Sequence, residues 1–338
     1  MKKKARTLAD IAKLAGVSES TVSRALSNNK LISEKTRSKI QQLATDNDFK
    51  INTSARNLRL QKSNTIAVVL LISSKHDQSV SDPFILSILG VIADELNELG
   101  YDLLLGSHKG SNQELINHYF DSKRADGLIV FGQGDNDEQF AELLSIDRPI
   151  VVWGASSPKG NYITVGTDNF RGGQLATEHL LEQGCKKIAF AGHLSYETNQ
   201  RYLGYKKALE SAGLKNSYHL DIHFSYTDSY KVTQSMLAAK LFDYDAVFAA
   251  SDSIALGIIR ALKEVGTRVP EDVAIVGYDD IPVAAFTHPS LSSVRQDTRQ
   301  GGKQLVSSLF ALMNKQAVAA TVLATELVIR DSSRPGNS

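Results

Sequence analysis

The stretch TLADIAKLAGVSESTVSRAL, residues 7–26, encodes two short amphipathic helices joined by a tight turn at Ala15-Gly16-Val17. We expect the first helix over about Leu8–Leu14, where Thr7 is a suitable N-cap. Asp10 stands three residues after this cap and completes the pattern of a capping box. The local sequence therefore specifies where this helix begins, and the glycine turn specifies where it ends.

The second helix is expected over about Glu19–Leu26, with Ser18 as its N-cap. Apolar residues on the facing sides of the two helices would pack together, which leaves several polar residues near the start of the second helix without a packing partner. These residues are Glu19, Ser20, Thr21, Ser23 and Arg24. A helix that enters the DNA major groove presents such side chains to base edges. The alternative is a pair of surface helices with no ligand, because such pairs are common.

The charge of the chain is divided unevenly. The run Lys2-Lys3-Lys4 with Arg6 precedes the helix pair, and a third helix, about Glu34–Asn47 with Ser33 as its cap, follows it. Residues 1–62 contain 14 Lys and Arg against 5 Asp and Glu, whereas the remainder contains 24 against 32. A basic head on an acidic body is the charge pattern of a protein that contacts phosphates.

Length and composition limit the class of protein. The chain has 338 residues, 42% of them hydrophobic, so it can bury a large core and is too long for one small domain. Its single cysteine, Cys185, excludes an intrachain disulfide framework and a Cys-rich zinc site, and fits a reducing compartment. No apolar run approaches the roughly 18 residues of a membrane span, and no apolar segment of a secretory signal follows the N-terminal lysines. We therefore expect a cytoplasmic protein.

Residues 46–64, DNDFKINTSARNLRLQKSN, are polar and have no core-forming periodicity. They are interpreted as a linker in which Ser54–Leu60 could form one or two helical turns. Ala55 and Leu58 are three residues apart and would share one face of such a helix. A flexible tether is the alternative.

From Asn64 onward, short apolar runs alternate with amphipathic helical stretches. The strand candidates are Ile66–Ile72, Asp102–Gly106, Gly127–Phe131, Ile150–Trp153, Tyr162–Val165, Lys187–Ala191, Ile222–Tyr226, Ala246–Ala250, Val273–Val276 and Thr321–Ile329. Continuous apolar strands that alternate with helices predict parallel sheets covered on both faces. These strands are too many for one small sheet, so we expect an α/β body of two doubly wound lobes, with a ligand in the crevice between them.

Motifs of catalysis and cofactor binding are missing from this body. The first strand is followed by Ser73-Ser74-Lys75-His76-Asp77 and not by the Gly-x-Gly-x-x-Gly of a dinucleotide-binding enzyme. Gly132-Gln133-Gly134 is interpreted as a turn. A Walker A run, a Gly-x-Ser-x-Gly elbow and a His-Glu-x-x-His pair are all absent, and the eight histidines are scattered. We predict no catalytic residue, cofactor or metal, and keep an enzymatic or sugar-binding α/β protein as the alternative of another class.

Polar and aromatic residues follow several of the expected strands. They are Phe131, Trp153, Asp168, Tyr226, Ser251, Asp252 and Asp279. Because such strand ends converge on one crevice, paired hydrogen-bonding groups would lie beside aromatic faces there, which suits a polyhydroxylated ring with an apolar side. Capping or loop solvation is the alternative for each polar residue, and core packing is the alternative for Trp153.

The motifs taken together resemble the lactose/galactose repressor family of bacterial transcription factors. The similarity is carried in the head by residues 7–40. In the body it is carried by Asp82-Pro83-Phe84, ADGLIVFG (125–132), VGTDNFRGGQLATEHLLEQGCKKIAFAG (165–192), QRYLGYKKAL (200–209), ASDSIALGIIRAL (250–262), PEDVAIVGYDD (270–280) and residues 289–297. These motifs run in order along nearly the whole chain.

The resemblance implies a fold with an N-terminal all-α helix-turn-helix head and a two-lobed, periplasmic-binding-protein-like α/β body. It implies a DNA-binding domain over residues 1–50, a hinge helix or linker over 51–63 and an effector-binding and dimerisation domain over 64–338. The first lobe would contain about 64–184 and 298–318, and the second about 185–297 and 319–334. The chain would cross between the lobes near Gly184, Asp297 and Val318–Thr321, and the protein would be a homodimer.

The resemblance also assigns contacts with double-stranded operator DNA. Glu19, Ser20 and Arg24 occupy the base-reading positions, where a glutamate could accept from a cytosine amino group. The remaining DNA-contacting positions of the head are Thr7, Leu8, Ser18, Thr21, Ser23 and Thr36. In the hinge, Ala55 and Leu58 would face the minor groove, and Leu58 would wedge into a central base step. Ile51 stands where the family usually has proline, so the start of the hinge helix is less fixed.

The same resemblance assigns an effector site. Arg201, Asp279 and Asp168 would bind effector hydroxyls, and Phe84, Phe131, Trp153 and Tyr226 would form apolar walls, with Ser251 and Asp252 beside them. Sugar-responsive members often have asparagine where this chain has Ser251. We expect a repressor that is released from a palindromic operator by a sugar, with a glucoside or short oligosaccharide favoured among sugars. A regulator with a purine-like corepressor is the alternative.

Overall fold

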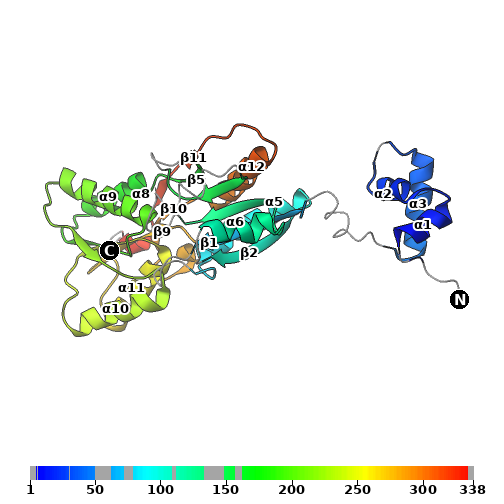
Figure 1. Cartoon of the computed structure of the whole chain (residues 1–338). Coiled ribbons are helices and arrows are strands. Elements are labelled where there is room, and N and C mark those ends of the chain that lie inside the picture. Colours follow the sequence, from blue (N-terminus) through cyan, green and yellow to red (C-terminus); the bar gives the residue numbers. More distant parts are fainter. Residues whose placement is uncertain are drawn as a thin grey trace. The chain divides into compact units, whose positions relative to one another are not determined.

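The computed structural model describes Ala5 and residues 7–29, 31–49, 62–71, 79–108, 112–132, 148–156 and 162–333. The chain forms two compact units, Met1–Ser63 and Asn64–Ser338 (Figure 1). Within the described ranges, no helix is long and apolar enough to cross a membrane. The expected combination of an all-α head and an α/β body with two sheets is confirmed.

The head contains three helices: α1 (Leu8–Ala15), α2 (Glu19–Leu26) and α3 (Glu34–Asp46). The capping box of α1 is present, because the backbone N–H of Asp10 donates to Thr7 Oγ1 at 3.1 Å and that of Thr7 donates to Asp10 Oδ2 at 3.0 Å. Gly16 ends α1 in the left-handed region at φ +71°. Ile11, Val22 and Ile40 are fully buried, one from each helix, and form the centre of the head's core.

The first sheet of the body has the strand order β11-β5-β4-β3-β1-β2, and all of its strand pairs are parallel. Its strands are β1 (Thr65–Leu71), β2 (Asp102–His108), β3 (Gly127–Phe131), β4 (Ile150–Trp153), β5 (Ile163–Thr167) and β11 (Thr321–Leu323). The helices α5 (Pro83–Glu98) and α12 (Thr298–Met313) pack together and cover one face. The short helices α6 (Asn112–Ile116) and η1 (Asn117–Asp121) contribute Leu115 and Tyr119 to a separate cluster on β1 and β3.

The second sheet has the order β12-β10-β9-β8-β6-β7, and only the β10–β12 pair is antiparallel. Its strands are β6 (Ile188–Ala191), β7 (Tyr218–Leu220), β8 (Ala246–Ala249), β9 (Ala274–Asp279), β10 (Ser292–Arg295) and β12 (Glu326–Val328). Figure 1 shows α8 (Asn169–Glu182) and α9 (Tyr196–Ser211) on one side of this sheet. On the other side lie α10 (Tyr226–Ala238) and α11 (Asp252–Glu264). The 3-10 helices η2 (Pro282–Phe286) and η3 (Asp331–Ser333) complete this lobe.

The chain passes between the lobes at positions that partly differ from those expected. Helix α8 packs on α9 and on the second sheet, so the first crossing is at Asp168 and not near Gly184. This close packing depends on glycine, because a Cβ on Gly173 would lie 2.0 Å from the backbone oxygen of Arg201. The second crossing lies at Asp297, where α12 begins. Of the described residues, the first lobe thus contains those within 64–167 and 298–323, and the second lobe contains those within 169–296 and 326–333.

Two strand predictions are wrong at the second sheet. The expected single strand 321–329 is two strands: β11 pairs with β5 of the first lobe and β12 pairs with β10 of the second, so the third crossing follows Leu323. The run 222–226 is not a strand, and β7 is formed by residues 218–220 instead.

The polar segment of residues 292–295 forms β10, which the sequence analysis missed. Its serines are buried because their hydroxyls have partners: Ser293 donates to Asp252 Oδ1 at 2.6 Å, and Ser292 donates to the backbone oxygen of Arg330 at 3.0 Å. A hydropathy pattern does not reveal buried serines that are satisfied in this way.

Candidate functional site

The second helix of the head exposes the side chains that the sequence analysis assigned to base edges. Glu19, Ser20 and Arg24 are all exposed on α2. Ser18 caps this helix, since its hydroxyl accepts from the backbone N–H of Thr21 at 3.2 Å. The exposed side chains therefore project from a helix whose start is capped.

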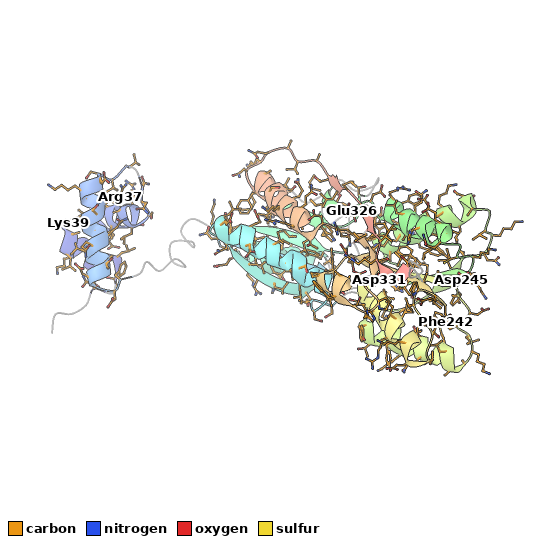
Figure 2. All side chains as sticks on the ribbon, turned by 180° about the vertical axis from the view of Figure 1, so that it is seen from behind. Arg37, Lys39, Phe242, Asp245, Glu326 and Asp331 are labelled. Carbon is orange, nitrogen blue, oxygen red and sulfur yellow. The ribbon has the colours of Figure 1, made fainter. Side chains whose placement is uncertain are left out.

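The third helix adds basic side chains to the head. Its cap, Ser33, accepts from the N–H of Thr36 at 3.3 Å. Figure 2 labels Arg37 and Lys39 on α3, and the Lys39 ammonium donates to the backbone oxygen of Ala15 at 3.2 Å. Leu8, by contrast, is half-buried and packs against the head's core. Its side chain is therefore used at least in part for packing.

A cleft that is partly open to solvent lies between the two lobes of the body. The first lobe lines it with apolar side chains and one glycine: Leu70, Leu71, Phe84, Ile85, Phe131, Gly132 and Trp153. The second lobe lines it mainly with polar side chains: His193, Ser195, Glu197, Thr198, Arg201 and Phe224, with Gln296 at the second crossing. We call this space the cleft below.

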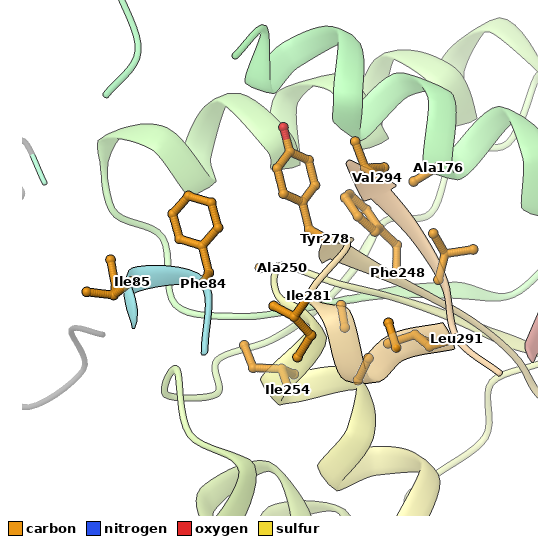
Figure 3. Close-up of a cluster of buried hydrophobic side chains, with 14 of the residues drawn as sticks. Phe84, Ile85, Ala176, Phe248, Ala250, Ile254, Tyr278, Ile281, Leu291 and Val294 are labelled. Atoms are coloured by element: carbon orange, nitrogen blue, oxygen red, sulfur yellow. The ribbon is translucent and has the colours of Figure 1, made fainter. Parts of the chain in front are cut away.

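The apolar wall of the cleft is an aromatic cluster. The rings of Phe84 and Trp153 lie 5.7 Å apart between centroids, and those of Phe131 and Trp153 lie 6.4 Å apart and nearly stacked. All three side chains are buried. The indole is held from behind by α12, because a Cβ on Gly301 would lie 2.6 Å from the Trp153 ring. Figure 3 shows Phe84 at the start of α5, in the same buried cluster as Ala250 and Ile281 of the second lobe.

Arg201 is the central polar group of the opposite wall. Its Nε donates to Asn169 Oδ1 at 2.7 Å, and its Nη1 donates to the backbone oxygen of Ala250 at 2.6 Å. The guanidinium also stacks on Tyr278, 3.7 Å from the ring centroid. Figure 3 shows the Tyr278 ring directed at α8. These contacts fix the orientation of Arg201, which is only 7% exposed at the surface of the cleft.

Two buried aspartates lie behind this wall. Asp279 accepts from Gln296 Nε2 at 2.7 Å, and burial raises the pKa of its carboxyl well above the ordinary value, although Arg201 acts in the opposite direction. Asp252 is fully buried and accepts from Ser293 Oγ at 2.6 Å and from the N–H of Ile281 at 2.8 Å. Burial raises the pKa of Asp252 to about 7. Both carboxyls are thus engaged inside the second lobe.

Hydrogen bonds also join the two lobes. The Ser253 hydroxyl, at the start of α11, donates to Asp82 Oδ2 at 3.0 Å, and the other oxygen of Asp82 caps α5 by accepting from the N–H of Phe84 at 2.9 Å. Thr167 Oγ1 donates to Gln296 Oε1 at 2.8 Å between two of the crossing segments. Burial raises the pKa of Asp82. The lobe arrangement seen here is therefore held by specific polar contacts as well as by the chain crossings.

Both units of the chain match known protein families. Residues 7–52 match the profile of the bacterial regulatory proteins of the lacI family, and residues 177–333 match a periplasmic binding protein-like domain. The HTH-type transcriptional regulator CelR of Thermobifida fusca is 32% identical over 334 residues, which cover 96% of this chain and 98% of CelR. The HTH-type transcriptional repressor PurR of Haemophilus influenzae is 31% identical over 340 residues, with the same coverage of each chain. The chain belongs to the lacI family.

Solved structures of lacI-family proteins have the same fold. The lac repressor dimer bound to operator and the anti-inducer ONPF aligns with a TM-score of 0.85 and 27% identity, covering 98% of this chain and 99% of that one. The CelR–cellobiose complex aligns with a TM-score of 0.68 and 29% identity, covering 97% and 100%. The predicted family and fold class are therefore confirmed: this lacI-family chain is a DNA-binding transcriptional regulator whose body is a ligand-binding domain.

The structure brings together four of the nine effector residues assigned from the sequence. Phe84, Phe131, Trp153 and Arg201 line the cleft. The other five do not. Ser251 is buried as the N-cap of α11, Asp252 and Asp279 lie behind the wall, Asp168 is exposed as the N-cap of α8, and Tyr226 lines a different groove beside Arg260 and His288. None of these five lies in the described lining of the cleft, so their assignment to the effector stays a prediction.

Several residues of the cleft were missed by the sequence analysis. Phe224 lines the cleft, whereas Tyr226, the first residue of α10, is exposed. His193 and Ser195 come from the connection between β6 and α9, and Glu197 from the first turn of α9; this segment follows a strand end and could have been included on that ground. The hinge positions Ile51, Ala55 and Leu58 lie outside the described residues. No group of three or more His, Cys, Asp or Glu that could hold a metal occurs in the described part of the chain.

Proposed function

We propose that this protein is a homodimeric, cytoplasmic repressor that is released from a palindromic operator when a sugar binds in the cleft. The observation that carries the proposal is the pairing of an aromatic wall on the first lobe with a polar wall, fixed around Arg201, on the second. A sugar ring matches this pairing, because its C–H faces pack on aromatic rings while its hydroxyls bond at the edges. The relative CelR has been solved with cellobiose, which supports a glucoside or short oligosaccharide.

Release from DNA follows from differential binding. A ligand that contacts both walls is bound only when the lobes have one arrangement, so it stabilises that arrangement over others. We infer that this arrangement disfavours formation of the paired hinge helices in the dimer. The coupling free energy needed is about 1–3 kcal/mol, the ordinary range for allosteric proteins. The ligand is bound and released unchanged, so no enzymatic activity is proposed.

The DNA contacts are assigned to the head and hinge. Glu19, Ser20 and Arg24 would read base edges, because they are exposed on a capped helix. The remaining contacts are assigned to phosphates through Thr7, the backbone of Leu8, Ser18, Thr21, Ser23 and Thr36. Ala55 and Leu58 would face the minor groove, with Leu58 as the wedge.

The operator proposal is tested by gel shift with the full chain on a palindromic site with a central CG step. We expect a shift that weakens with rising salt, since phosphate contacts release counterions. Leu58→Ala should weaken this specific binding by about tenfold and spare binding to random DNA, because a wedge acts only at the kinked step. Absence of a salt-sensitive shift would remove the repressor proposal, and equal loss on both DNAs would remove the wedge.

The sugar proposal is tested by isothermal titration of the full chain with cellobiose, methyl β-glucoside, hypoxanthine and guanine. We expect binding of a sugar, and addition of that sugar should weaken the operator shift. Binding of nucleobases alone would favour the second candidate, a purine-dependent corepressor. That candidate is supported by PurR relatives at about 30% identity and by aromatic faces that could stack on a base.

A further inference from the structure

We propose that Thr167 is a positioning residue for the effector, because its hydroxyl holds the amide of Gln296 in place at the surface of the cleft. The inference rests on the proposed function, since it concerns the sugar bound in the cleft. Thr167 is absent from the described lining of the cleft, whereas Gln296 belongs to it. Thr167 therefore acts on the ligand through Gln296.

The Gln296 amide is held from two sides. Thr167 Oγ1 donates to Gln296 Oε1 at 2.8 Å, and Gln296 Nε2 donates to Asp279 Oδ1 at 2.7 Å. The two partners end strands of different sheets: Thr167 is the last residue of β5 in the first lobe, and Asp279 is the last residue of β9 in the second. Gln296 is only 5% exposed and stands just before the second crossing. Its amide is therefore fixed by one bond from each lobe.

These two bonds leave part of the amide for a ligand. An amide has two lone pairs on its oxygen and two N–H groups on its nitrogen. Among the described residues, Gln296 uses one of each, so one acceptor and one donor remain at the cleft. A sugar hydroxyl, which donates and accepts, matches this pair. Without the Thr167 hydroxyl the amide has one side-chain partner and is free to turn, so ligand binding must first order it.

The first crossing segment positions a second polar group of the cleft as well. Asn169 Nδ2 donates to the backbone oxygen of Thr167 at 3.2 Å, and Asn169 Oδ1 accepts from Arg201 Nε at 2.7 Å. Residues 167–169 thus bond to both Gln296 and Arg201, which line the cleft. Thr167 and Asn169 are buried, so water does not readily replace a lost bond. Three consecutive residues therefore set the relative positions of two groups that face the ligand.

The test is isothermal titration of the full chain with cellobiose or methyl β-glucoside, whichever binds more tightly, and with its monodeoxy derivatives. Gln296→Leu identifies the hydroxyl that Gln296 binds, because removing that hydroxyl should weaken binding to the wild type and not to this variant. Thr167→Val keeps the β-branched shape and loses the hydroxyl. It should bind the parent sugar about fivefold more weakly and bind the matching deoxy sugar as the wild type does. Thr167→Ser keeps the hydroxyl and should stay within about twofold of the wild type for the parent sugar.

Thr177→Val is the matched control, because Thr177 is a buried threonine of α8 whose hydroxyl donates to the backbone oxygen of Gly173 at 2.8 Å, outside the described cleft lining. It should leave all affinities unchanged. The double variant of Thr167→Val and Gln296→Leu should bind no more weakly than Gln296→Leu alone, since the two residues act as one unit. If either single variant binds every ligand as the wild type does, if Thr167→Val weakens all ligands equally, or if the two losses add, this inference is overturned and the sugar proposal stands. If the wild type binds none of these sugars, both proposals fail.

Discussion

The two walls of the cleft are built differently. On the first lobe, the central strands β1, β3 and β4 are apolar to their ends, and Phe131 and Trp153 are simply their last residues. On the second lobe, the wall comes from the connection after β6 and the first turns of α9, where Glu197 and Arg201 lie. Neither lobe alone therefore forms a site. The first lobe supplies an apolar surface for packing, and the second supplies polar groups that would orient a ligand.

This division of roles links ligand binding to lobe arrangement. An aromatic face alone would bind many apolar molecules, and a polar wall alone would remain hydrated. A ligand with an apolar face and a polar edge gains from both only while the walls face each other. The contact of Ser253 with Asp82 joins the two lobes in the arrangement seen here. Variants on each wall can therefore test whether the two walls act together.

Arg201→Ala should have the largest effect, because it removes the centre of the polar wall. Effector affinity should fall by about 100-fold, the range for truncating a buried hydrogen-bonded charge. The free energy of unfolding should also fall by about 2–4 kcal/mol, since Asn169 and the Ala250 carbonyl lose their donor. Titration calorimetry and urea denaturation measure both quantities.

Operator affinity without effector should be unchanged in this variant under conditions where it remains folded. Arg171→Ala is the control, because Arg171 lies on α8 in an exposed pair with Glu178. A folded Arg201→Ala protein that fails to bind operator would contradict the placement of Arg201 in the effector site.

Trp153→Phe should have an intermediate effect, because it reduces the apolar wall while keeping an aromatic ring. We expect effector affinity to fall by about fivefold. Phe242→Leu serves for comparison, since Phe242 packs on Tyr244 in the second lobe and is absent from the cleft lining. An unchanged affinity would show that the indole packs in the core and does not contact the ligand.

Ser253→Ala should have a smaller effect, because it touches neither wall and removes only the bond between the lobes. Asp82 would lose one donor in a buried position, so the observed arrangement would become less stable. We expect effector affinity to fall by about threefold, measured by titration. Ser307→Ala, on the exposed side of α12, should leave affinity unchanged. Equal effects of the two variants would mean that the Asp82–Ser253 contact does not bias the lobes.

Asp252→Asn should change ligand binding least, because Asp252 lies behind the polar wall. Its effect is on pH dependence: with a pKa of about 7 in the folded protein against an ordinary value of 3.8, the carboxyl stays protonated on folding between these values. The unfolding free energy contributed by Asp252 is therefore lost as pH rises from about 4 to about 7, by up to about 1.4 kcal/mol per pH unit.

Urea denaturation of wild type and Asp252→Asn between pH 4.5 and 7.5 measures this decline, which the variant should lack. Asp272→Asn provides a contrast, because the pKa of Asp272 is shifted in the opposite direction. Arg268 lowers it to about 2, so the ionised carboxylate is favoured. If the free energy of unfolding depends on pH in the same way in the wild type and in Asp252→Asn, the assignment of this decline to Asp252 is wrong.

The sequence by itself determined the features that arise from short-range physics. The caps and glycine turn of residues 7–26 specify α1 and α2, because a capping box needs only neighbours three residues apart. The continuous apolar runs at 127–131 and 150–153 specify parallel strands, because both of their faces are covered. The charge division and the motif order were sufficient to indicate the family.

Only the tertiary structure decided which lobe each segment joins and which side chains reach the cleft. Helix α8 belongs to the second lobe because Gly173 lets the backbone of α9 approach, a contact between residues 28 positions apart in the sequence. Phe224 and not Tyr226 lines the cleft because the start of α10 turns the chain between them. Asp279 and Asp252 are buried outside the described cleft lining, where Gln296 and Ser293 from other segments supply their hydrogen bonds. A strand end predicts the edge of a sheet, but long-range contacts decide which residue is left free to bind.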